Sequence, residues 1–314
     1  MYIINKNVKK GEKMLYPYEL VDVKPKLNKK KIIFLIIIVL IIIVLSVYSA
    51  IKLAEINKQK QIQIEQAKIE EEKRIEQERI AEELRKEQEK LKNANPFTEE
   101  QMQAIENIYN EGNEKRVFLT FDDGPTQAVT PYILDLLNQE NIKATFFVLG
   151  NRAKANPSLI QRQFDEGHYI ANHGYTHKYS QIYQNKQTVL DEYNYTEQCI
   201  QQALNNTNYH SKVFRFPGGS QGGYYKNIKN ESKVYLRQNG IVSLDWNALS
   251  KDAEGAKTKE ELLQNVIYTV GDKQSVVILM HDSADKILTY EVLPDVIKYL
   301  REKGYQFKTL YDIL

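Results

Sequence analysis

The sequence contains a single cysteine, Cys199, in 314 residues, so the chain cannot form an internal disulfide bond. We interpret Cys199 as a small core residue, which is the usual place of a free cysteine. A strong net charge is also missing, because 43 basic residues against 41 acidic ones leave only +2. Without a general basic field, the composition does not predict a nucleic-acid partner.

Charge is absent altogether from Ile32–Ile51, which reads IIFLIIIVLIIIVLSVYSAI over 20 residues. About 20 apolar residues in a helix are enough to cross ~30 Å of hydrocarbon. The run is longer than the core of a cleaved signal peptide, and no clear small-residue cleavage site follows it. Nine lysines against three acids in residues 1–31 predict a cytoplasmic basic tail. We therefore expect a single-pass signal anchor at 32–51 with the rest of the chain outside the cell, and a buried core helix is the alternative.

Glycine and proline are missing from residues 52–92, where 11 basic residues balance 11 acidic ones. Opposite charges recur at helical spacing, as in Glu70 with Arg74 and Glu82 with Lys86, and each such pair adds ~0.2–0.5 kcal/mol to a helix. The apolar residues form no continuous heptad seam, which favours a solvated single helix over a stable coiled coil. We predict a charged stalk over residues 52–95 that acts as a spacer. Disorder is the alternative, and the oligomeric state stays open.

Residues 96–113 have the pattern of a linker with a short helix, opened by Thr98 and Gln101 as a capping box. Strand-like and helix-like segments then alternate through a domain predicted at 114–314, and Thr130 before Pro131 is the expected cap of its first helix. The predicted strands are 117–121, 144–149, 169–172, 213–216, 241–244, 275–280 and 305–309; the predicted helices are 132–140, 157–166, 188–205, 224–239, 258–270 and 285–303. About seven such units predict an α/β fold with a parallel sheet covered by helices.

Residues suited to catalysis follow five of these strands. The first strand runs through FLTFDDGP (118–125) into two adjacent aspartates. The strand ends carry Asp122 and Asp123, then His173 and His177 in NHGYTH, Arg215 in RFPGGS, Asp245 and Trp246, and finally His281. In a parallel barrel the chemistry lies at the carboxyl ends of the strands, so we expect these side chains on one rim. Three of the five histidines in the chain fall there.

Each group taken alone also has a structural interpretation. Two aspartates before Gly-Pro can begin a turn, and His173 and His177 can be surface residues. Arg215 can serve an ion pair, Trp246 the core, and His281 the start of a helix. A buried pair of carboxylates, however, is costly unless a cation lies between them. Their joint placement therefore predicts an active site.

The five segments FLTFDDGP, NHGYTH, FRFPGGS, SLDW and ILMHD, in this order, resemble the motifs of polysaccharide deacetylases with a NodB-homology domain, carbohydrate esterase family four. The segments KATFFVLGN and DEGHYIANH resemble that family too. The resemblance covers roughly residues 114–314 and does not include the anchor or the stalk. It implies a distorted (β/α)7 barrel with one divalent metal, Zn²⁺ first, with Co²⁺, Ni²⁺ or Mn²⁺ as alternatives.

The resemblance also implies a role for each matching residue. Asp123, His173 and His177 match the metal ligands, a set that suits hydrolytic Zn²⁺ with an open position. Asp122 matches the general base, and Arg215 matches the residue that orients this base. One carboxylate of the adjacent pair would thus bind the cation while its neighbour takes a proton from water.

The remaining matches concern the leaving group, the oxyanion and the acetyl methyl group. His281 matches the general acid, and Asp245 matches the residue that orients and charges this histidine. The backbone N–H of Gly218 matches the oxyanion donor, while Trp246 and Leu279 match apolar walls around the acetyl methyl group.

The sequence departs from the family pattern at three positions. Gly174 stands where Ser or Thr often follows the first metal histidine, Gly218 where many members have Tyr, and Val242 where a further Asp is common. None of these changes removes a matched ligand, base or acid. They bear on substrate preference and rate.

The function implied is metal-dependent removal of N-acetyl groups from a cell-surface glycan, with the N-acetylglucosamine of peptidoglycan as the first candidate. Chitin oligosaccharide, poly-N-acetylglucosamine and O-acetylated xylan are the alternatives among substrates. A non-catalytic glycan-binding surface protein and a scaffold built on the stalk are the alternatives to an enzyme. The expected partners are the glycan and the membrane.

Overall fold

The computed structural model describes residues 29–94, 97–110, 112 and 114–314, with side chains of 80–94 excepted. Most of the predicted basic tail, residues 1–28, lies outside the described residues. The chain divides into two compact units, 1–78 and 79–314, which are described separately.

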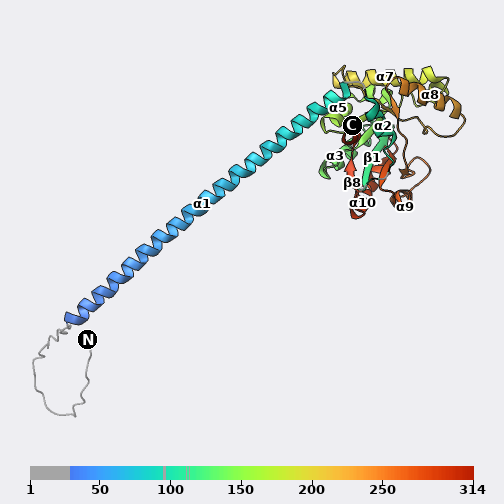
Figure 1. The fold of residues 1–314 in the computed structure, drawn as a ribbon. Helices are drawn as coiled ribbons and strands as arrows, with labels where there is room; N and C mark the ends of the chain where they lie inside the picture. Colours follow the sequence, from blue (N-terminus) through green and yellow to red (C-terminus); the bar gives the residue numbers. More distant parts are fainter. Residues whose placement is uncertain (1–28, 95–96, 111, 113) are drawn as a thin grey trace, which may run out of the picture. The chain divides into compact units, whose positions relative to one another are not determined.

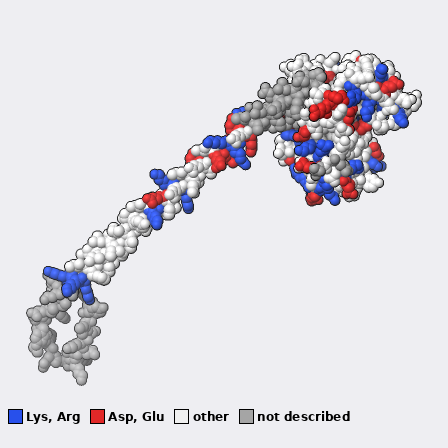
Figure 2. All heavy atoms as spheres, in the orientation of Figure 1, with Lys and Arg blue, Asp and Glu red and all other residues white. Residues whose placement is uncertain are grey.

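Helix α1 (Lys29–Ala94) runs for 66 residues and begins at three consecutive lysines. A long stretch without charge follows them and then gives way to mixed charges (Figure 2). Part of 29–79 is long and apolar enough to cross a membrane, judged by length and composition. Further along, Arg74 forms ion pairs with Glu71 and Glu78, at N–O distances of 2.7 and 4.0 Å. The predicted stalk is therefore helical over its described residues.

The second unit is built on a parallel sheet with eight strands in its described residues. They are β1 (Arg116–Asp122), β2 (Thr145–Val148), β3 (Tyr169–Asn172), β4 (Val213–Phe214), β5 (Val242–Ser243), β6 (Ala248–Leu249), β7 (Ser275–His281) and β8 (Gln306–Lys308). The order is β5-β4-β3-β2-β1-β7-β6, and β8 pairs with the first half of β1. This curled parallel sheet confirms the predicted α/β fold of the distorted-barrel type.

Helices cover the sheet and its two edges. They are α2 (Glu99–Glu106), α3 (Thr130–Gln139), α4 (Gly150–Ala155), α5 (Pro157–Asp165), α6 (Tyr179–Ile182), α7 (Lys186–Leu204), α8 (Lys226–Gln238), α9 (Lys259–Val270), α10 (Ile287–Glu302) and the 3-10 helix η1 (Leu310–Ile313). Helix α8 packs on β5 beside α7, and α9 packs on β6 beside α10 (Figure 1).

Alternating residues of β1 separate two cores, because successive side chains of a strand point to opposite faces. Val117, Leu119 and Phe121 pack among the surrounding helices in one cluster. Phe118 packs in a second cluster on the inner face of the curled sheet. Fully burying an apolar side chain of this size contributes about 1.5–3 kcal/mol. The two faces together fix the register of β1, and Asp122 therefore comes out on the inner face with Phe118.

The segment predicted as a linker contributes to the inner core. Thr98 and Gln101 form the expected capping box at the start of α2. Phe97, Ile105 and Ile108 are buried against the inner cluster that also contains Phe118 and other residues of the sheet. Helix α2 also contacts η1, so these two helices close the inner face together. The packed part of the second unit therefore includes residues upstream of the predicted boundary at 114.

Thr130 does not cap α3, contrary to the sequence prediction. The helix begins at Thr130 itself, and its N-cap, Val129, makes no side-chain cap bond. The Thr130 hydroxyl instead accepts a hydrogen bond from the N–H of Thr126 at 2.8 Å and donates one to Asp282 Oδ2 at 2.6 Å. A hydroxyl cap was expected because Thr precedes Pro, but a buried carboxylate next to it competes for the hydroxyl group.

Candidate active site

The register of the two central strands sets the first pair of site residues side by side. Strands β1 and β7 are parallel, with Thr120 opposite Leu279 and Asp122 opposite His281. These four residues share one face of the sheet because they alternate in step. Leu279 therefore lies on the predicted site face, one row behind His281. Asp123 would point to the opposite face, but its φ of 74° breaks the strand alternation.

Asp123 and the two predicted ligand histidines come together. The Asp123 Oδ1 atom lies 3.5 Å from His173 Nε2 and 3.4 Å from His177 Nε2. One ligand atom from each of the three residues falls within 4.8 Å of the others. Asp123 Oδ1 is buried and has no hydrogen-bond partner among the described residues. An unpaired buried carboxylate oxygen between two imidazoles is the environment that a cation would satisfy.

The hydrogen bond of His173 fixes which of its nitrogens faces the cluster. His173 Nδ1 lies 2.8 Å from the carbonyl oxygen of Arg215. A carbonyl oxygen only accepts, so Nδ1 carries the proton and Nε2 keeps a lone pair towards Asp123. Burial lowers the pKa of His173 to about 3, which keeps the ring neutral near pH 7. A carboxylate with two imidazoles is a ligand set that fits a divalent cation such as Zn²⁺.

Asp122 is held by Arg215 from behind. Arg215 is fully buried, and its Nη1 donates to Asp122 Oδ1 at 2.8 Å and to Thr120 Oγ1 at 2.7 Å. The guanidinium also lies over the ring of Phe147, 3.8 Å from its centroid. Burial raises the pKa of Asp122 above its ordinary value, although the charges of Arg215 and His281 oppose this shift. A carboxylate with a raised pKa is suited to accept a proton.

The partner of His281 is Asp252, and the prediction that Asp245 orients this histidine is wrong. Asp252 Oδ1 lies 2.8 Å from His281 Nδ1, and Asp252 Oδ2 accepts from the His281 N–H at 2.7 Å and from the Thr289 hydroxyl at 2.8 Å. Burial lowers the pKa of His281, but the hydrogen bond and charge of Asp252, followed by those of Asp122 and Asp123, outweigh burial and raise this pKa to about 9. His281 is therefore protonated at neutral pH.

Asp245 instead supports the loop that follows β4. Its carboxylate accepts from the N–H of Ser220 at 2.9 Å and from the Ser220 hydroxyl at 2.6 Å. Its backbone oxygen accepts from Arg215 Nη2 at 2.8 Å. Asp245 thus connects this loop to the arginine behind Asp122. Asp252 reaches His281 because it follows β6, the strand that pairs with β7.

The loop Pro217–Ser220 is held by hydrogen bonds at Pro217, Gly219 and Ser220. Gly218 and Gly219 both have φ of 74°, a left-handed conformation that glycine adopts without cost. The Tyr183 hydroxyl donates to the Pro217 oxygen at 2.7 Å, and Lys229 Nζ donates to the Gly219 oxygen at 2.7 Å. Within the described residues, the N–H of Gly218 makes no hydrogen bond with protein. It is therefore available as a donor, and its role at the oxyanion stays a prediction.

Trp246 borders the same loop. A Cβ atom on Gly219 would lie 3.1 Å from Cη2 of this indole, so the ring packs directly against the glycine backbone. The Arg215 guanidinium lies 5.6 Å from the centroid of the Trp246 ring. The half-buried indole thus lies close to both the loop and the arginine behind Asp122, in a position to form a wall of the site.

Glu192 is a site residue that the sequence analysis missed. This buried carboxylate of α7 accepts from the N–H groups of Tyr175 and Thr176, at 2.6 and 2.8 Å, and from the Thr176 hydroxyl at 2.9 Å. It holds the loop between the two histidines, next to Gly174, which has no hydroxyl to do so. A signal was present, since Glu192 lies on the buried stripe of α7 that includes Val189 and Thr196.

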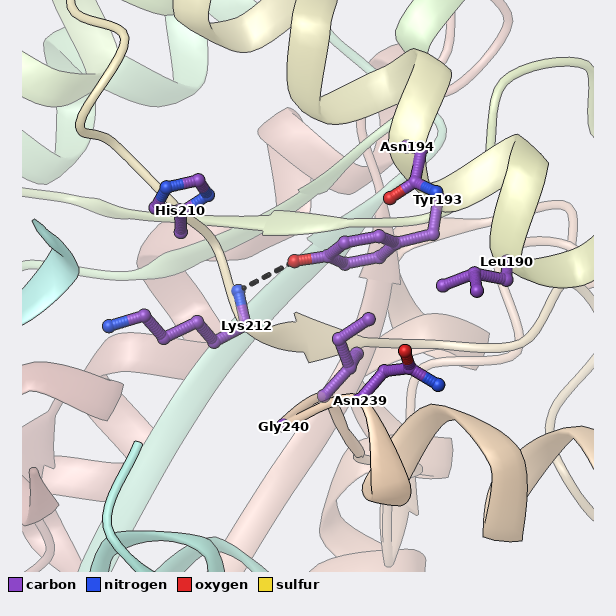
Figure 3. A pocket seen from close by; sticks show the side chains of 8 residues that line it. Leu190, Tyr193, Asn194, His210, Lys212, Asn239 and Gly240 are labelled. Carbon is purple, nitrogen blue, oxygen red and sulfur yellow. Dashed lines mark hydrogen bonds between the residues drawn. The ribbon is translucent and has the colours of Figure 1, made fainter. Parts of the chain in front are cut away.

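A separate cavity of about 350 Å³ lies at the other end of the strands (Figure 3). It is lined by His210 and Lys212 just before β4 and by Gly240 and Ile241 just before β5. The Lys212 N–H donates to the Tyr193 hydroxyl at 3.1 Å, and burial lowers the pKa of Lys212 to about 8. Because catalytic groups of such parallel folds gather at the carboxyl ends of the strands, we place the active site at Asp122 and not here.

A parallel α/β sheet with an Asp-His-His cluster, a raised-pKa carboxylate and a protonated histidine on one rim has the make-up of a hydrolase site. The family model for polysaccharide deacetylases matches residues 109–236. A peptidoglycan-N-acetylglucosamine deacetylase of Bacillus cereus is 34% identical over 207 residues, which cover 64% of this chain and 71% of that protein. This chain belongs to the polysaccharide deacetylase family.

Two further comparisons agree with this family. The peptidoglycan-N-acetylglucosamine deacetylase PgdA of Listeria monocytogenes is 32% identical over 199 residues, covering 63% of this chain but only 39% of that longer protein. A solved CE4 esterase of Streptococcus mutans superposes with a TM-score of 0.59 at 33% identity, covering 66% of this chain and 90% of its own. The relatives support a hydrolase that deacetylates glycans.

Proposed function

We propose that this chain is a metal-dependent deacetylase that removes N-acetyl groups from the N-acetylglucosamine of peptidoglycan. The observation that carries the proposal is the joint placement of the Asp123–His173–His177 cluster, Asp122 and His281 on one rim. The relatives in Bacillus cereus and Listeria monocytogenes are named for this substrate, which supports peptidoglycan as the first candidate.

The three ligand residues would hold a divalent cation, Zn²⁺ first, with Co²⁺, Ni²⁺ or Mn²⁺ as alternatives. When bound, such a cation lowers the pKa of water and polarises the acetyl carbonyl group. Asp122 accepts the proton of the attacking water, a role supported by its raised pKa and by the Arg215 bond that orients it. The water oxygen then forms a bond to the acetyl carbon.

The other residues complete the reaction on the substrate. The N–H of Gly218 stabilises the negative charge that develops on the carbonyl oxygen. His281 gives its proton to the sugar nitrogen as the carbon–nitrogen bond breaks, so that an amine leaves rather than an amide anion. Trp246 and Leu279 enclose the acetyl methyl group. Acetate and a free amino sugar are the products.

We further propose that α1 anchors the protein in the cell membrane, with its N-terminus in the cytoplasm and residues 114–314 outside. The charge-free stretch after Lys29–Lys31 supports the span, and the lysines before it support the orientation. An anchored enzyme of this kind acts on a polymer close to the outer face of the membrane.

The deciding experiment measures acetate released from purified peptidoglycan by the full chain in detergent. Release that stops with a chelator and returns with Zn²⁺ would support both the reaction and its metal dependence. Release only from chitin oligomers or acetylated xylan would keep the reaction and replace the substrate. If metal binds and none of these polymers yields acetate, the result would favour the alternative of a non-catalytic glycan-binding protein.

A further inference from the structure

Tyr179 lies where the two functional loops of the site meet. It begins α6, two residues after the predicted metal ligand His177, and the two ring centroids are 5.6 Å apart. A Cβ atom on Gly218 would lie only 2.5 Å from the Tyr179 hydroxyl oxygen. The tyrosine therefore occupies the space that a side chain at position 218 would need.

The position of Tyr179 is fixed by packing on its inner side. The ring of Tyr183 lies 5.7 Å away by centroid, and Tyr183 is itself buried and bonded to the Pro217 oxygen. Lys229, which is bonded to the Gly219 oxygen, has its Nζ 5.9 Å from the Tyr179 ring and 5.0 Å from the Tyr183 ring. The groups that hold the oxyanion loop thus hold Tyr179 as well.

The outer side of Tyr179 is open to solvent. The residue is 41% exposed, and within the described residues its hydroxyl makes no hydrogen bond with protein. A fixed hydroxyl that can both donate and accept, next to a rigid loop, is the kind of group that orients a polar ligand.

We propose that Tyr179 is a substrate-binding residue whose hydroxyl bonds a polar group of the sugar ring that carries the acetyl group. Its ring forms the wall of the site over Gly218. The inference rests on the proposed function, because it concerns the same site. It adds a contact that does not belong to the metal ligands, the base or the acid, and that selects an N-acetylated pyranose over a smaller acetyl compound.

The test compares Tyr179→Phe and Tyr179→Ala with the matched control Tyr268→Phe in the full chain. Tyr268 is 85% exposed on α9 and is not one of the residues that form the site. With soluble peptidoglycan fragments as substrate, Tyr179→Phe should raise KM about five- to tenfold, the usual worth of one hydrogen bond, while kcat stays within about twofold. Tyr179→Ala should raise KM further, and both variants should bind as much Zn²⁺ as the wild type.

An unchanged KM in Tyr179→Phe would overturn the proposal. A loss of Zn²⁺ in that variant would overturn it as well, because Tyr179 would then only support His177. If the wild type releases no acetate, fragment binding to Asp122→Asn is compared with binding to the double variant Asp122→Asn/Tyr179→Phe. Weaker binding by the double variant would keep the Tyr179 proposal and reject catalysis. Equal binding, or none to either, would reject the Tyr179 proposal too.

Discussion

At the scale of single residues, the pair His281–Asp252 controls the protonation of the proposed general acid. The acid must carry its proton, so the rate falls as the pH rises through the pKa of His281. Asp252 raises this pKa by a hydrogen bond and a charge, against the effect of burial. We expect Asp252→Asn to lower the pKa of His281 and to move the alkaline limb of the kcat/KM profile to lower pH.

The matched control for this prediction is Asp245→Asn. The Asp245 carboxylate bonds Ser220, so this variant should reduce the rate and leave the alkaline limb in place. Both profiles are measured on peptidoglycan fragments at saturating Zn²⁺. A limb that moves in Asp245→Asn and stays in Asp252→Asn would restore the original expectation for Asp245.

A second prediction at the residue scale concerns Glu192 and the affinity for Zn²⁺. Its carboxylate accepts three hydrogen bonds from the loop between the two ligand histidines. In Glu192→Gln the amide NH2 group cannot accept hydrogen bonds, so it would face the loop donors without bonding them and the loop would loosen. Substitution of residues that orient metal ligands through hydrogen bonds weakens metal binding by about 10–100-fold. We expect a drop of this size in Zn²⁺ affinity.

Zn²⁺ affinity is measured by competition with a chelating dye, which does not depend on turnover. Asp191→Asn is the control, because Asp191 precedes Glu192 on α7 and, among the described residues, its carboxylate bonds only Gln187 of the same helix. Equal affinities for the wild type and Glu192→Gln would show that the loop is held without this carboxylate.

Much of the site was predictable because polar residues stand out at the ends of apolar strands. Asp122, Asp123 and His281 follow long buried strands, and the structure brings them together. Asp252 obeys the same rule, since it follows β6, but a strand of two residues has no periodicity to detect. Tyr179 had no signal in the sequence, because its place over Gly218 depends on two loops that are distant in the chain.

At the scale of elements, α2 closes the inner face of the sheet. Ile105 is fully buried there among residues of β1, β3 and η1. Ile105→Ala should therefore lower the free energy of unfolding of the second unit by ~2–5 kcal/mol, and Ile105→Val by only ~0.5–1.5 kcal/mol. The single tryptophan, Trp246, packs against the same cluster, so its fluorescence during urea unfolding reports the change.

The test depends on the difference between the two substitutions, because both remove atoms from the same buried side chain, Ile105. If alanine costs no more than valine, α2 is not part of the cooperative unit and residues 96–113 are the linker that the sequence predicts. If the alanine cost is large, a domain cut at residue 114 would lose part of its core.

The long elements of the second unit were predictable, and the short ones were not. Helices α7, α9 and α10 begin and end within two residues of their predicted bounds, since each is long enough to show a buried stripe. Helices α4 and α6 have six and four residues, which cannot be distinguished from turns by pattern. Residues 96–113 have the pattern of a linker for a related reason: Ile105 is the one buried side chain among the eight residues of α2, and so few apolar positions do not distinguish a packed helix from an exposed one.

At the scale of the whole molecule, the chain joins a hydrolase unit, which buries its apolar side chains, to a helix that leaves its apolar side chains exposed. The side chains of α1 at its apolar start are exposed, although exposed isoleucine and leucine in such a run are costly in water. About 20 residues of this kind match the thickness of a bilayer. The apolar start of α1 therefore needs a membrane or a partner, whereas the second unit buries its own core.

Removal of residues 1–51 should transfer the protein from the membrane fraction to the soluble fraction, because no other helix among the described residues is long and apolar enough to span a bilayer. Acetate release from soluble peptidoglycan fragments should be unchanged, since the site lies wholly in the second unit. Release from the wall of intact cells should fall, because the proposed anchor would no longer hold the enzyme beside the proposed polymer.

The control replaces residues 32–51 with an unrelated apolar segment of the same length behind the same lysines. If the span acts through length and hydropathy alone, this variant should return to the membrane and recover activity on the wall. A truncated protein that stays in the membrane fraction would mean that the second unit binds the membrane by itself. A replaced span that restores location without activity on the wall would mean that α1 makes a specific contact beyond anchoring.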